Sequence, residues 1–223
     1  MKVTHRPRLA VLLSGDGSNL QALINATDNG SIKADIVIVI SNKVGARGLQ
    51  RAQNAGIKNT VIDNLQFSDR KSFDCALALE LKKQDLDLII LAGFMRILTS
   101  EFVESFTGRI LNIHPSLLPK YRGLNTYQKA IDAGDKNAGA TVHFVTSELD
   151  GGPPIIQSKV PIHRNDTSDD LAQRILKLEH QIYPLAVKWF CEDRLSLINE
   201  EAFLDSSVLP KSGLNYTDTI KDE

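Results

Sequence analysis

Two polar side chains with complementary chemistry stand one residue apart in the stretch LNIHPSLLPKYRG, which runs from Leu111 to Gly123. Asn112 carries an amide that donates hydrogen bonds through its NH₂ group, and His114 carries an imidazole, the side chain that changes charge nearest neutral pH. The two prolines that follow exclude a helix or a central strand, so we expect a short apolar strand to end at Leu111. Because side chains of an extended chain alternate, Asn112 and His114 point to the same side, as an oxyanion donor and a proton carrier.

A carboxylate that complements this pair lies in the acidic segment Glu148-Leu149-Asp150, which Gly151-Gly152-Pro153 turns sharply back. A carboxylate beside a histidine favours the imidazolium and raises its pKa, which makes the ring a general acid at working pH. We therefore expect Asp150 to hold His114 in its charged form. The alternative is structural, because a histidine after a strand often bonds only to backbone and Asp-Gly-Gly is ordinary turn chemistry. The combination of the three residues favours the catalytic interpretation.

A glycine-rich turn near the start of the chain predicts a phosphate site. The apolar run from Leu9 to Leu13 has the composition of a buried parallel strand, and a tight turn and a helix follow it. Backbone amides of Gly17, Ser18 and Asn19 at the helix N-terminus, with the helix dipole behind them, suit an anion. A plain strand-to-helix turn would need the same glycines. The third glycine of the dinucleotide fingerprint is missing, so a mononucleotide-type phosphate fits better than NAD.

Four motifs occur along the chain in an order and spacing that are specific to one family. They are Ser14-Gly15-Asp16-Gly17-Ser18-Asn19-Leu20-Gln21, Leu91-Ala92-Gly93-Phe94-Met95-Arg96-Ile97-Leu98, Asn112-Ile113-His114-Pro115-Ser116-Leu117-Leu118-Pro119 and Leu149-Asp150-Gly151-Gly152-Pro153. These four motifs make the chain resemble the folate-dependent formyltransferases. Among these enzymes it resembles those that formylate glycinamide ribonucleotide (GAR). The resemblance extends from about Arg8 to about Leu204.

The resemblance implies a reaction in purine biosynthesis, the transfer of a formyl group from 10-formyltetrahydrofolate to the amine of GAR. The amine attacks the formyl carbon directly, without a covalent enzyme intermediate and without a metal. Asn112 and protonated His114 would stabilise the tetrahedral oxyanion. Asp150 would keep His114 charged and receive the proton that the amine sheds.

The resemblance also implies which residues bind the two substrates. The GAR phosphate would lie at Gly17, Ser18 and Asn19, and Glu179 would contact GAR. The folate side comprises Arg70 at the glutamate tail, Met95, Arg96, Ile97 and Leu98 around the pteridine ring, and Asn112, Thr146, Ser147, Glu148, Leu149 and Asp150. Without the resemblance, Arg70 and Glu179 would be interpreted as solvated surface residues and Arg96 as a structural residue.

Three positions depart from the family pattern. Asp16 stands where asparagine is frequent, and its charge would lie close to a bound phosphate. Arg122 and Asn125 replace the proline and the histidine of the common Tyr-Pro-Gly-Leu-His segment. The family's histidine has been linked to substrate binding, so the resemblance does not carry that contact over to Asn125.

Strand-like and helix-like segments alternate, which predicts a doubly wound, mostly parallel, Rossmann-like α/β sheet with helices on both faces, in a single domain. The segments 140–145 and 155–162 form the exception, an antiparallel edge joined by the acidic loop. The glycine turn, the Met95 segment and Asn112 all follow strands and should gather at one sheet edge. We place the formyltransferase domain at 1–204, with a phosphate-binding N-terminal half and a C-terminal half that completes the folate cleft. A loosely held polar tail would follow at 205–223.

Three local features complete the sequence-based prediction. Ser68 should cap a helix that runs to about Gln84. Residues 195–198 should form a last edge strand. His143 should be a hydrogen-bonded strand histidine rather than a second catalytic group.

Composition excludes several classes of function. The net charge of −1 and the isoelectric point near 6.5 give no electrostatic footprint for nucleic acid. No apolar run is long enough to span a membrane, and Cys75 and Cys191 lack metal-ligand spacing, so we expect a cytoplasmic chain with free thiols and no metal. The alternatives are a relative that formylates methionyl-tRNA, one that hydrolyses formyltetrahydrofolate, and a non-catalytic nucleotide-binding module. The tRNA enzyme would need an added basic domain, for which the length and charge leave no room.

Overall fold

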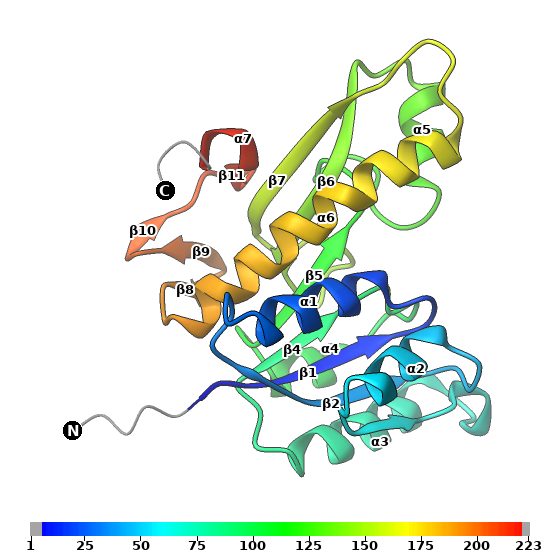
Figure 1. Cartoon of the computed structure of the whole chain (residues 1–223), viewed down its shortest axis with the longest axis vertical. Helices are drawn as coiled ribbons and strands as arrows, with labels where there is room; N and C mark the ends of the chain where they lie inside the picture. Colours follow the sequence, from blue (N-terminus) through cyan, green and yellow to red (C-terminus); the bar gives the residue numbers. More distant parts are fainter. Residues whose placement is uncertain (1–5, 220–223) are drawn as a thin grey trace. The chain divides into compact units, whose positions relative to one another are not determined.

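The computed structural model describes residues 6–219 of the chain (Figure 1). Its backbone contacts group into two compact units, Met1–Leu111 and Asn112–Glu223, which are described in turn. None of the helices in the described residues is long and apolar enough to cross a membrane.

The first unit is built on a parallel sheet whose middle strand is the apolar run predicted from the sequence. Strand β1 (Arg8–Leu13) lies between β2 (Asp35–Ser41) and β4 (Leu88–Leu91), and β3 (Asn59–Val61) pairs with the outer side of β2. Residues Leu9–Leu13 are completely buried. Helices cover both faces of a parallel sheet, so its central strand carries apolar side chains at every position.

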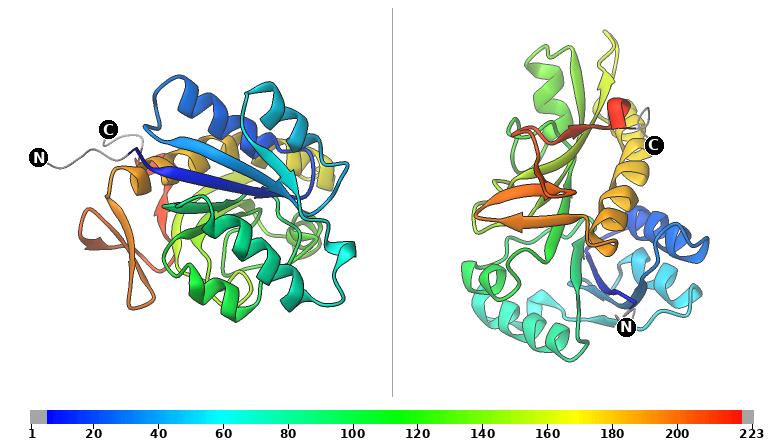
Figure 2. Two further views of the ribbon diagram at one scale, coloured as in Figure 1. Left: turned by 90° about the horizontal axis from the view of Figure 1, so that it is seen from below. Right: turned by 90° about the vertical axis from the view of Figure 1, so that its left-hand side faces the viewer.

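Helices α1 (Ser18–Asp28) and α2 (Arg47–Asn54) lie on one face of this sheet, and α3 (Arg70–Lys82) and α4 (Ser100–Ser105) lie on the other (Figure 2). A 3-10 turn, η1 (Asn64–Gln66), precedes α3. The prediction that Ser68 caps α3 is wrong by one residue. The Asp69 carboxylate accepts a hydrogen bond from the Ser72 amide at 2.7 Å. An aspartate at the N-cap pairs with an amide that has no partner within the helix, and its negative charge interacts favourably with the helix dipole.

Strand β5 (Ile110–His114) begins in the first unit and ends in the second. We expected the strand to end at Leu111, but it continues through Asn112 and His114 until Pro115. Asn112 and His114 therefore both lie in a β-strand, in which side chains two residues apart point to the same side, as expected.

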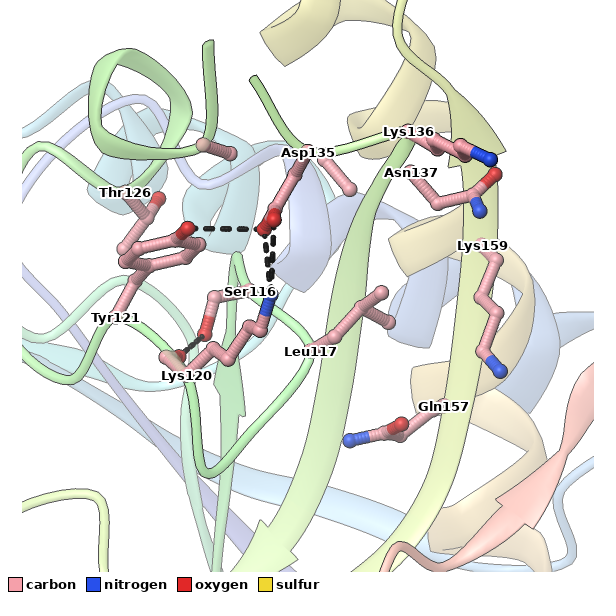
Figure 3. Close-up of a pocket in the computed structure, with 12 residues that line it drawn as sticks. Ser116, Leu117, Lys120, Tyr121, Thr126, Asp135, Lys136, Asn137, Gln157 and Lys159 are labelled. Carbon is pink, nitrogen blue, oxygen red and sulfur yellow. Dashed lines mark hydrogen bonds and ion pairs between the residues drawn. The ribbon is translucent and has the colours of Figure 1, made fainter. Parts of the chain in front are cut away.

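The second unit contains the antiparallel pair that the sequence predicted, β6 (Asn137–Phe144) and β7 (Pro154–Pro161). Helix α5 (Thr126–Asp132) precedes β6, and the long α6 (Ser168–Cys191) packs along β6 and β7 (Figure 1). Helix α6 begins at a capping box in which Thr167 and Asp170 satisfy each other's backbone amides. A cavity of about 360 Å³ opens beside α5 and this strand pair, and Lys120 and Asp135 are among the residues that line it (Figure 3).

The end of the chain differs from the prediction in two ways. The strand predicted at 195–198 is present as β8 (Leu195–Ile198) and lies at a sheet edge, but it is not the last strand. It belongs to a separate antiparallel sheet with β9 (Glu201–Leu204) and β10 (Ser207–Val208), which follow it. The segment after Asp205 is also not loosely held where it is described. Strand β11 (Leu214–Asn215) pairs with β7 and leads into α7 (Tyr216–Thr219). Two-residue strands carry no readable periodicity, so the sequence could not indicate them.

Candidate functional site

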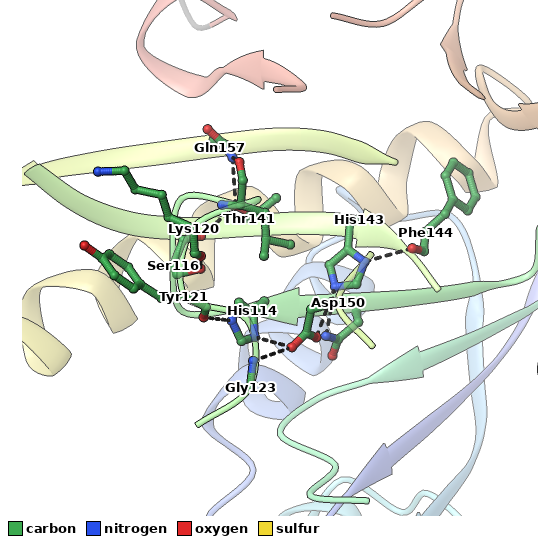
Figure 4. A network of polar contacts seen from close by, with 12 residues as sticks. His114, Ser116, Lys120, Tyr121, Gly123, Thr141, His143, Phe144, Asp150 and Gln157 are labelled. Atoms are coloured by element: carbon green, nitrogen blue, oxygen red, sulfur yellow. Dashed lines mark hydrogen bonds and ion pairs between the residues drawn. The ribbon is translucent and has the colours of Figure 1, made fainter. Parts of the chain in front are cut away.

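The second unit brings together the amide, the imidazole and the carboxylate singled out from the sequence. Figure 4 shows the imidazole of His114 and the carboxylate of Asp150 facing each other. Asp150 Oδ2 lies 3.4 Å from His114 Nδ1, and the two side chains are only 9% and 7% exposed. The other carboxylate oxygen, Oδ1, lies 3.8 Å from Nε2 of His143. The expected approach of Asp150 to His114 is therefore present in the structure.

Both ring nitrogens of His114 face groups that accept hydrogen bonds. Nε2 lies 2.9 Å from the backbone oxygen of Tyr121, and Nδ1 faces the Asp150 carboxylate. A carbonyl oxygen and an ionised carboxylate can only accept, so the ring satisfies both when both nitrogens carry hydrogen. This assignment follows from the partners. Each ring nitrogen of His114 therefore has an acceptor in front of it.

His143, on β6, orients the Asn112 amide. Its Nδ1 lies 2.8 Å from the Phe144 carbonyl oxygen, which requires hydrogen on Nδ1 and leaves a lone pair on Nε2. That lone pair accepts from Asn112 Nδ2 at 3.0 Å. Burial lowers the pKa of His143 to about 4, against the opposing effects of the Phe144 hydrogen bond and of Asp150, so the ring is neutral at pH 7. The interpretation of His143 as a hydrogen-bonded strand histidine is confirmed, although its contact with Asn112 had no signal in the sequence.

Two loops hold the Asp150 carboxylate in place. The Gly123 amide donates to Oδ2 at 2.9 Å, and Arg122 forms an ion pair with Glu148 that joins the two loops. Asp150 itself has a left-handed backbone conformation, with φ of 47°. A Cβ atom on Gly152 would lie 1.9 Å from the Phe144 carbonyl oxygen, so only glycine allows the loop to approach the end of β6 this closely.

The departures Arg122 and Asn125 have structural roles in this unit. Arg122 supplies the ion pair to Glu148. Asn125 is the residue before α5 and adopts φ of 61°, a left-handed conformation that asparagine tolerates better than most residues. A cavity of about 330 Å³ lies beside Asp150, and Arg122 and Lys211 are among its lining residues.

In the first unit, Ser14 joins the glycine turn to the Met95 segment. Its backbone amide donates to the Gly93 carbonyl at 3.1 Å, and its hydroxyl accepts the Met95 amide at 2.7 Å. Gly17 precedes α1 with φ of 76°, and no side chain caps the helix. A Cβ on Gly17 would lie 2.6 Å from Gly48 Cα, so this position requires glycine both for conformation and for space.

Asp16 does not leave an uncompensated charge beside this turn. Its carboxylate lies 2.8 Å from Arg51 and 3.3 Å from Arg47, and the Arg51 Nε also donates to the Asp16 carbonyl at 2.8 Å. The two cations offset the extra negative charge at this departure from the family pattern.

The residues predicted to wall a pteridine pocket differ in exposure. Met95 and Ile97 are 63% and 47% exposed, whereas Leu98 is buried. The Arg96 guanidinium lies over the Phe73 ring, 4.6 Å from its centroid, which supports a structural role for this side chain. Burial raises the pKa of Asp74. The hydrogen bonds from Thr99 and, more weakly, the charges of Arg96 and Arg70 oppose this rise. Arg70 occupies the first turn of α3, as predicted.

Two further predictions concern the second unit. Glu179 lies on α6 and is only 5% exposed, so its interpretation from residue type alone, as a solvated surface residue, is wrong. Burial and the charge of Glu179 raise the pKa of Tyr127, which places the two side chains near each other. The residues Thr146, Ser147, Glu148 and Leu149 form the loop from β6 to Asp150.

Among the described residues there is no group of three or more His, Cys, Asp or Glu side chains that could hold a metal ion.

The half-buried amide of Asn112 and the buried side chains of His114 and Asp150 suit a transferase of the formyl transferase family. Residues 7–187 match that family, and the chain belongs to it. It is 52% identical over 92% of its length to phosphoribosylglycinamide formyltransferase of Haemophilus influenzae and 48% identical over 92% to that of Escherichia coli, and it covers 97% of each relative.

Solved structures agree with the sequence relatives. The phosphoribosylglycinamide formyltransferase of Coxiella burnetii superposes with a TM-score of 0.91 at 45% identity, covering 95% of this chain and 100% of that one. Glycinamide ribonucleotide transformylase 1 of Symbiobacterium toebii gives 0.87 at 44% identity, covering 90% and 94%. These likenesses confirm the predicted α/β fold, with a mostly parallel mixed sheet flanked by helices.

Proposed function

We propose that Asn112, His114 and Asp150 carry out the reaction of this GAR formyltransferase of de novo purine biosynthesis, in which 10-formyltetrahydrofolate donates the formyl group. The observation that carries the proposal is the buried pairing of Asp150 Oδ2 with His114 Nδ1 at 3.4 Å. An acyl-transfer reaction that passes through an oxyanion needs groups that stabilise the oxyanion and a group that accepts a proton. An amide, an imidazole and a carboxylate can fill these roles.

In the proposed reaction the GAR amine attacks the formyl carbon, and a C–N bond forms as the carbonyl π electrons move onto oxygen. Asn112 donates to this oxyanion with the Nδ2 hydrogen that His143 does not take. Asp150 receives, through water, the proton shed by the attacking amine. The intermediate then collapses, the bond from carbon to folate N10 breaks, and N10 takes up, through water, the proton that Asp150 received. One preorganised donor contributes roughly 2.7 to 4 kcal/mol to such a reaction.

His114 acts in this scheme mainly through its charge. Its Nε2 already bonds to the Tyr121 carbonyl, so direct donation to the oxyanion requires the oxyanion to take the place of that carbonyl. A fixed imidazolium in a buried site stabilises developing negative charge without reorganisation of solvent. Asp150 maintains that charge by facing the other ring nitrogen.

The binding roles are part of the same proposal. The amides of Gly17, Ser18 and Asn19 would hold the GAR phosphate, supported by a helix start that has no side-chain cap. Glu179 would contact GAR. The exposed apolar side chains of Met95 and Ile97 support the proposed pteridine wall with Arg96 and Leu98.

The remaining folate contacts would come from Arg70 at the glutamate tail and from the loop of Thr146, Ser147, Glu148 and Leu149. We place the reaction in the cytoplasm, which agrees with two cysteines that form no disulfide.

The test compares the purified wild-type protein with Asn112→Ala and His114→Ala. We expect each change to lower kcat by about 100-fold or more, because each removes preorganised stabilisation of the oxyanion. Consumption of 10-formyltetrahydrofolate is followed with GAR, with methionyl-tRNA and with water alone as acceptor. His163→Ala, at an exposed histidine, serves as the control. Near-normal turnover of GAR by either variant would refute the assignment of that residue.

A further inference from the structure

The carboxylate of Asp135 accepts three hydrogen bonds from Lys120 and Tyr121, which lie 15 and 14 residues earlier in the chain (Figure 3). Lys120 Nζ donates to Oδ1 at 2.8 Å and to Oδ2 at 2.9 Å, and the Tyr121 hydroxyl donates to Oδ2 at 2.9 Å. The Asp135 side chain is 21% exposed. The hydrogen bonds from Lys120 and Tyr121 hold the pKa of Asp135 below its usual range, so the carboxylate is ionised at neutral pH.

The same segment reaches the proposed catalytic pair through its backbone. The Tyr121 carbonyl oxygen lies 2.9 Å from His114 Nε2, and the Gly123 amide donates to Asp150 Oδ2 at 2.9 Å (Figure 4). Two peptide groups of one short loop therefore orient both members of the pair. Asp135 touches neither His114 nor Asp150 in any of these contacts.

The loop needs an external support to hold this shape. Tyr121 has a φ of 55°, and a left-handed conformation is unfavourable for a bulky residue other than glycine. Such a conformation persists only when surrounding contacts impose it. The hydrogen bonds to Asp135 act on Tyr121 itself and on its neighbour Lys120, whose carbonyl also accepts the Ser116 hydroxyl at 2.6 Å.

We infer that Asp135 is a positioning residue for formyl transfer, because it holds Lys120 and Tyr121 so that the loop backbone fixes His114 and Asp150. The inference rests on the proposed roles of His114 and Asp150. Without Asp135, the Tyr121 backbone is free to leave the left-handed region, and the carbonyl and amide that orient the pair move with it. Small displacements of catalytic groups have large effects on rate, and a shift of 1 Å can cost about 100-fold.

The decisive variant is Asp135→Ala, compared with Asp132→Ala as a matched control on the same segment. Asp132 is an exposed residue whose carboxylate accepts from Gln128 on its own helix. We expect Asp135→Ala to lower kcat by about 10-fold or more, while KM for GAR and for 10-formyltetrahydrofolate stays within about twofold. Asp132→Ala should leave kcat unchanged.

A second measurement separates positioning from general stability. In protein labelled with ¹⁵N-histidine, the ring signals of His114, assigned by their loss in His114→Gln, should shift in Asp135→Ala and not in Asp132→Ala. Unchanged kcat or unchanged His114 signals in Asp135→Ala overturn the inference, even if the melting temperature falls. If Asp135→Ala does not fold, Lys120→Met and Tyr121→Phe each remove part of the support and are judged by the same two readouts.

The outcomes also separate this inference from the function on which it rests. An active His114→Ala variant would overturn the catalytic assignment, whatever Asp135→Ala does. An inactive His114→Ala variant together with a fully active Asp135→Ala variant would overturn only the role of Asp135.

Discussion

Single residues of this chain compensate one another where the family pattern is broken. Asp16 adds a carboxylate next to the amides proposed for the GAR phosphate, and Arg51 and Arg47 lie against that carboxylate. Neither partner is fully buried, since Asp16 is 48% and Arg51 29% exposed, so the pair contributes little to folding stability. Its consequence should appear in the binding of an anion, because a charge left unpaired repels a phosphate.

We predict that Arg51→Met raises KM for GAR about 3- to 10-fold at low salt, and less at high salt where the charge is screened. Asp16→Asn should restore KM in the double variant, since it removes the carboxylate that Arg51 offsets. Steady-state kinetics of the two single variants and the double variant measure this coupling. Arg6→Met, which breaks a similar surface pair with Asp35, is the control. Equal KM values in Arg51→Met and the double variant would contradict the explanation.

The buried His143 makes the free energy of unfolding depend on pH. Its pKa is about 4 in the folded chain, against about 6.5 in an unfolded one. Between these values the unfolded chain binds a proton that the folded chain does not, so the free energy of unfolding falls as the pH drops from 6.5 toward 4.

We predict that this single group lowers the free energy of unfolding by about 2 kcal/mol between pH 7.5 and pH 5, and that His143→Gln lacks this part of the pH dependence. Guanidinium unfolding at both pH values measures the difference between the two proteins. His163→Gln, at an exposed histidine, should behave as the wild type. The same loss on acidification in wild type and His143→Gln would show that His143 is not buried in its neutral form.

At the scale of elements, the loop between β6 and β7 places Asp150, and Gly152 sets the path of that loop. A side chain at position 152 would collide with the carbonyl of Phe144, which is backbone and cannot move aside. The strands on either side are paired by their own hydrogen bonds. A larger residue should therefore displace the loop and leave the strand pair intact.

We predict that Gly152→Ala lowers kcat by about 10-fold or more while the far-ultraviolet circular dichroism spectrum stays unchanged. Gly45→Ala is the matched control, because a Cβ there meets nothing within 4 Å. If Gly152→Ala keeps wild-type kcat, the loop has another way to place the Asp150 carboxylate.

At the scale of the whole molecule, the C-terminal segment covers an edge strand. Strand β11 pairs with Ile156 and Gln157 of β7, and Gly213 approaches the Ile155 backbone so closely that a Cβ would lie 2.8 Å from its carbonyl carbon. An uncovered edge strand exposes unpaired backbone groups and promotes aggregation.

We predict that a chain ending at Pro210 melts several degrees lower than the wild type and aggregates more readily, because it lacks β11. A chain ending at Thr219 retains β11 and should match the wild type. Scanning calorimetry and light scattering measure both effects. Equal melting temperatures for the two truncated chains would mean that β11 does not support the sheet.

Much of this architecture is local and could be predicted from the order of the residues. The apolar run Leu9–Leu13 determined a buried parallel strand, the Thr167 box determined the start of α6, and the spacing of Asn112 and His114 determined that they share a side. Each of these depends on backbone geometry within a few residues.

Only the tertiary structure decided what surrounds those residues. The Tyr121 carbonyl at His114, the lone pair of His143 at Asn112, the support from Asp135 and the pairing of β11 with β7 all join positions distant along the chain. Every residue except proline carries both a backbone carbonyl and an amide N–H, so residue type cannot reveal which of these groups will meet a catalytic side chain. That choice depends on how the folded elements pack, and burial then keeps the His143 imidazole neutral.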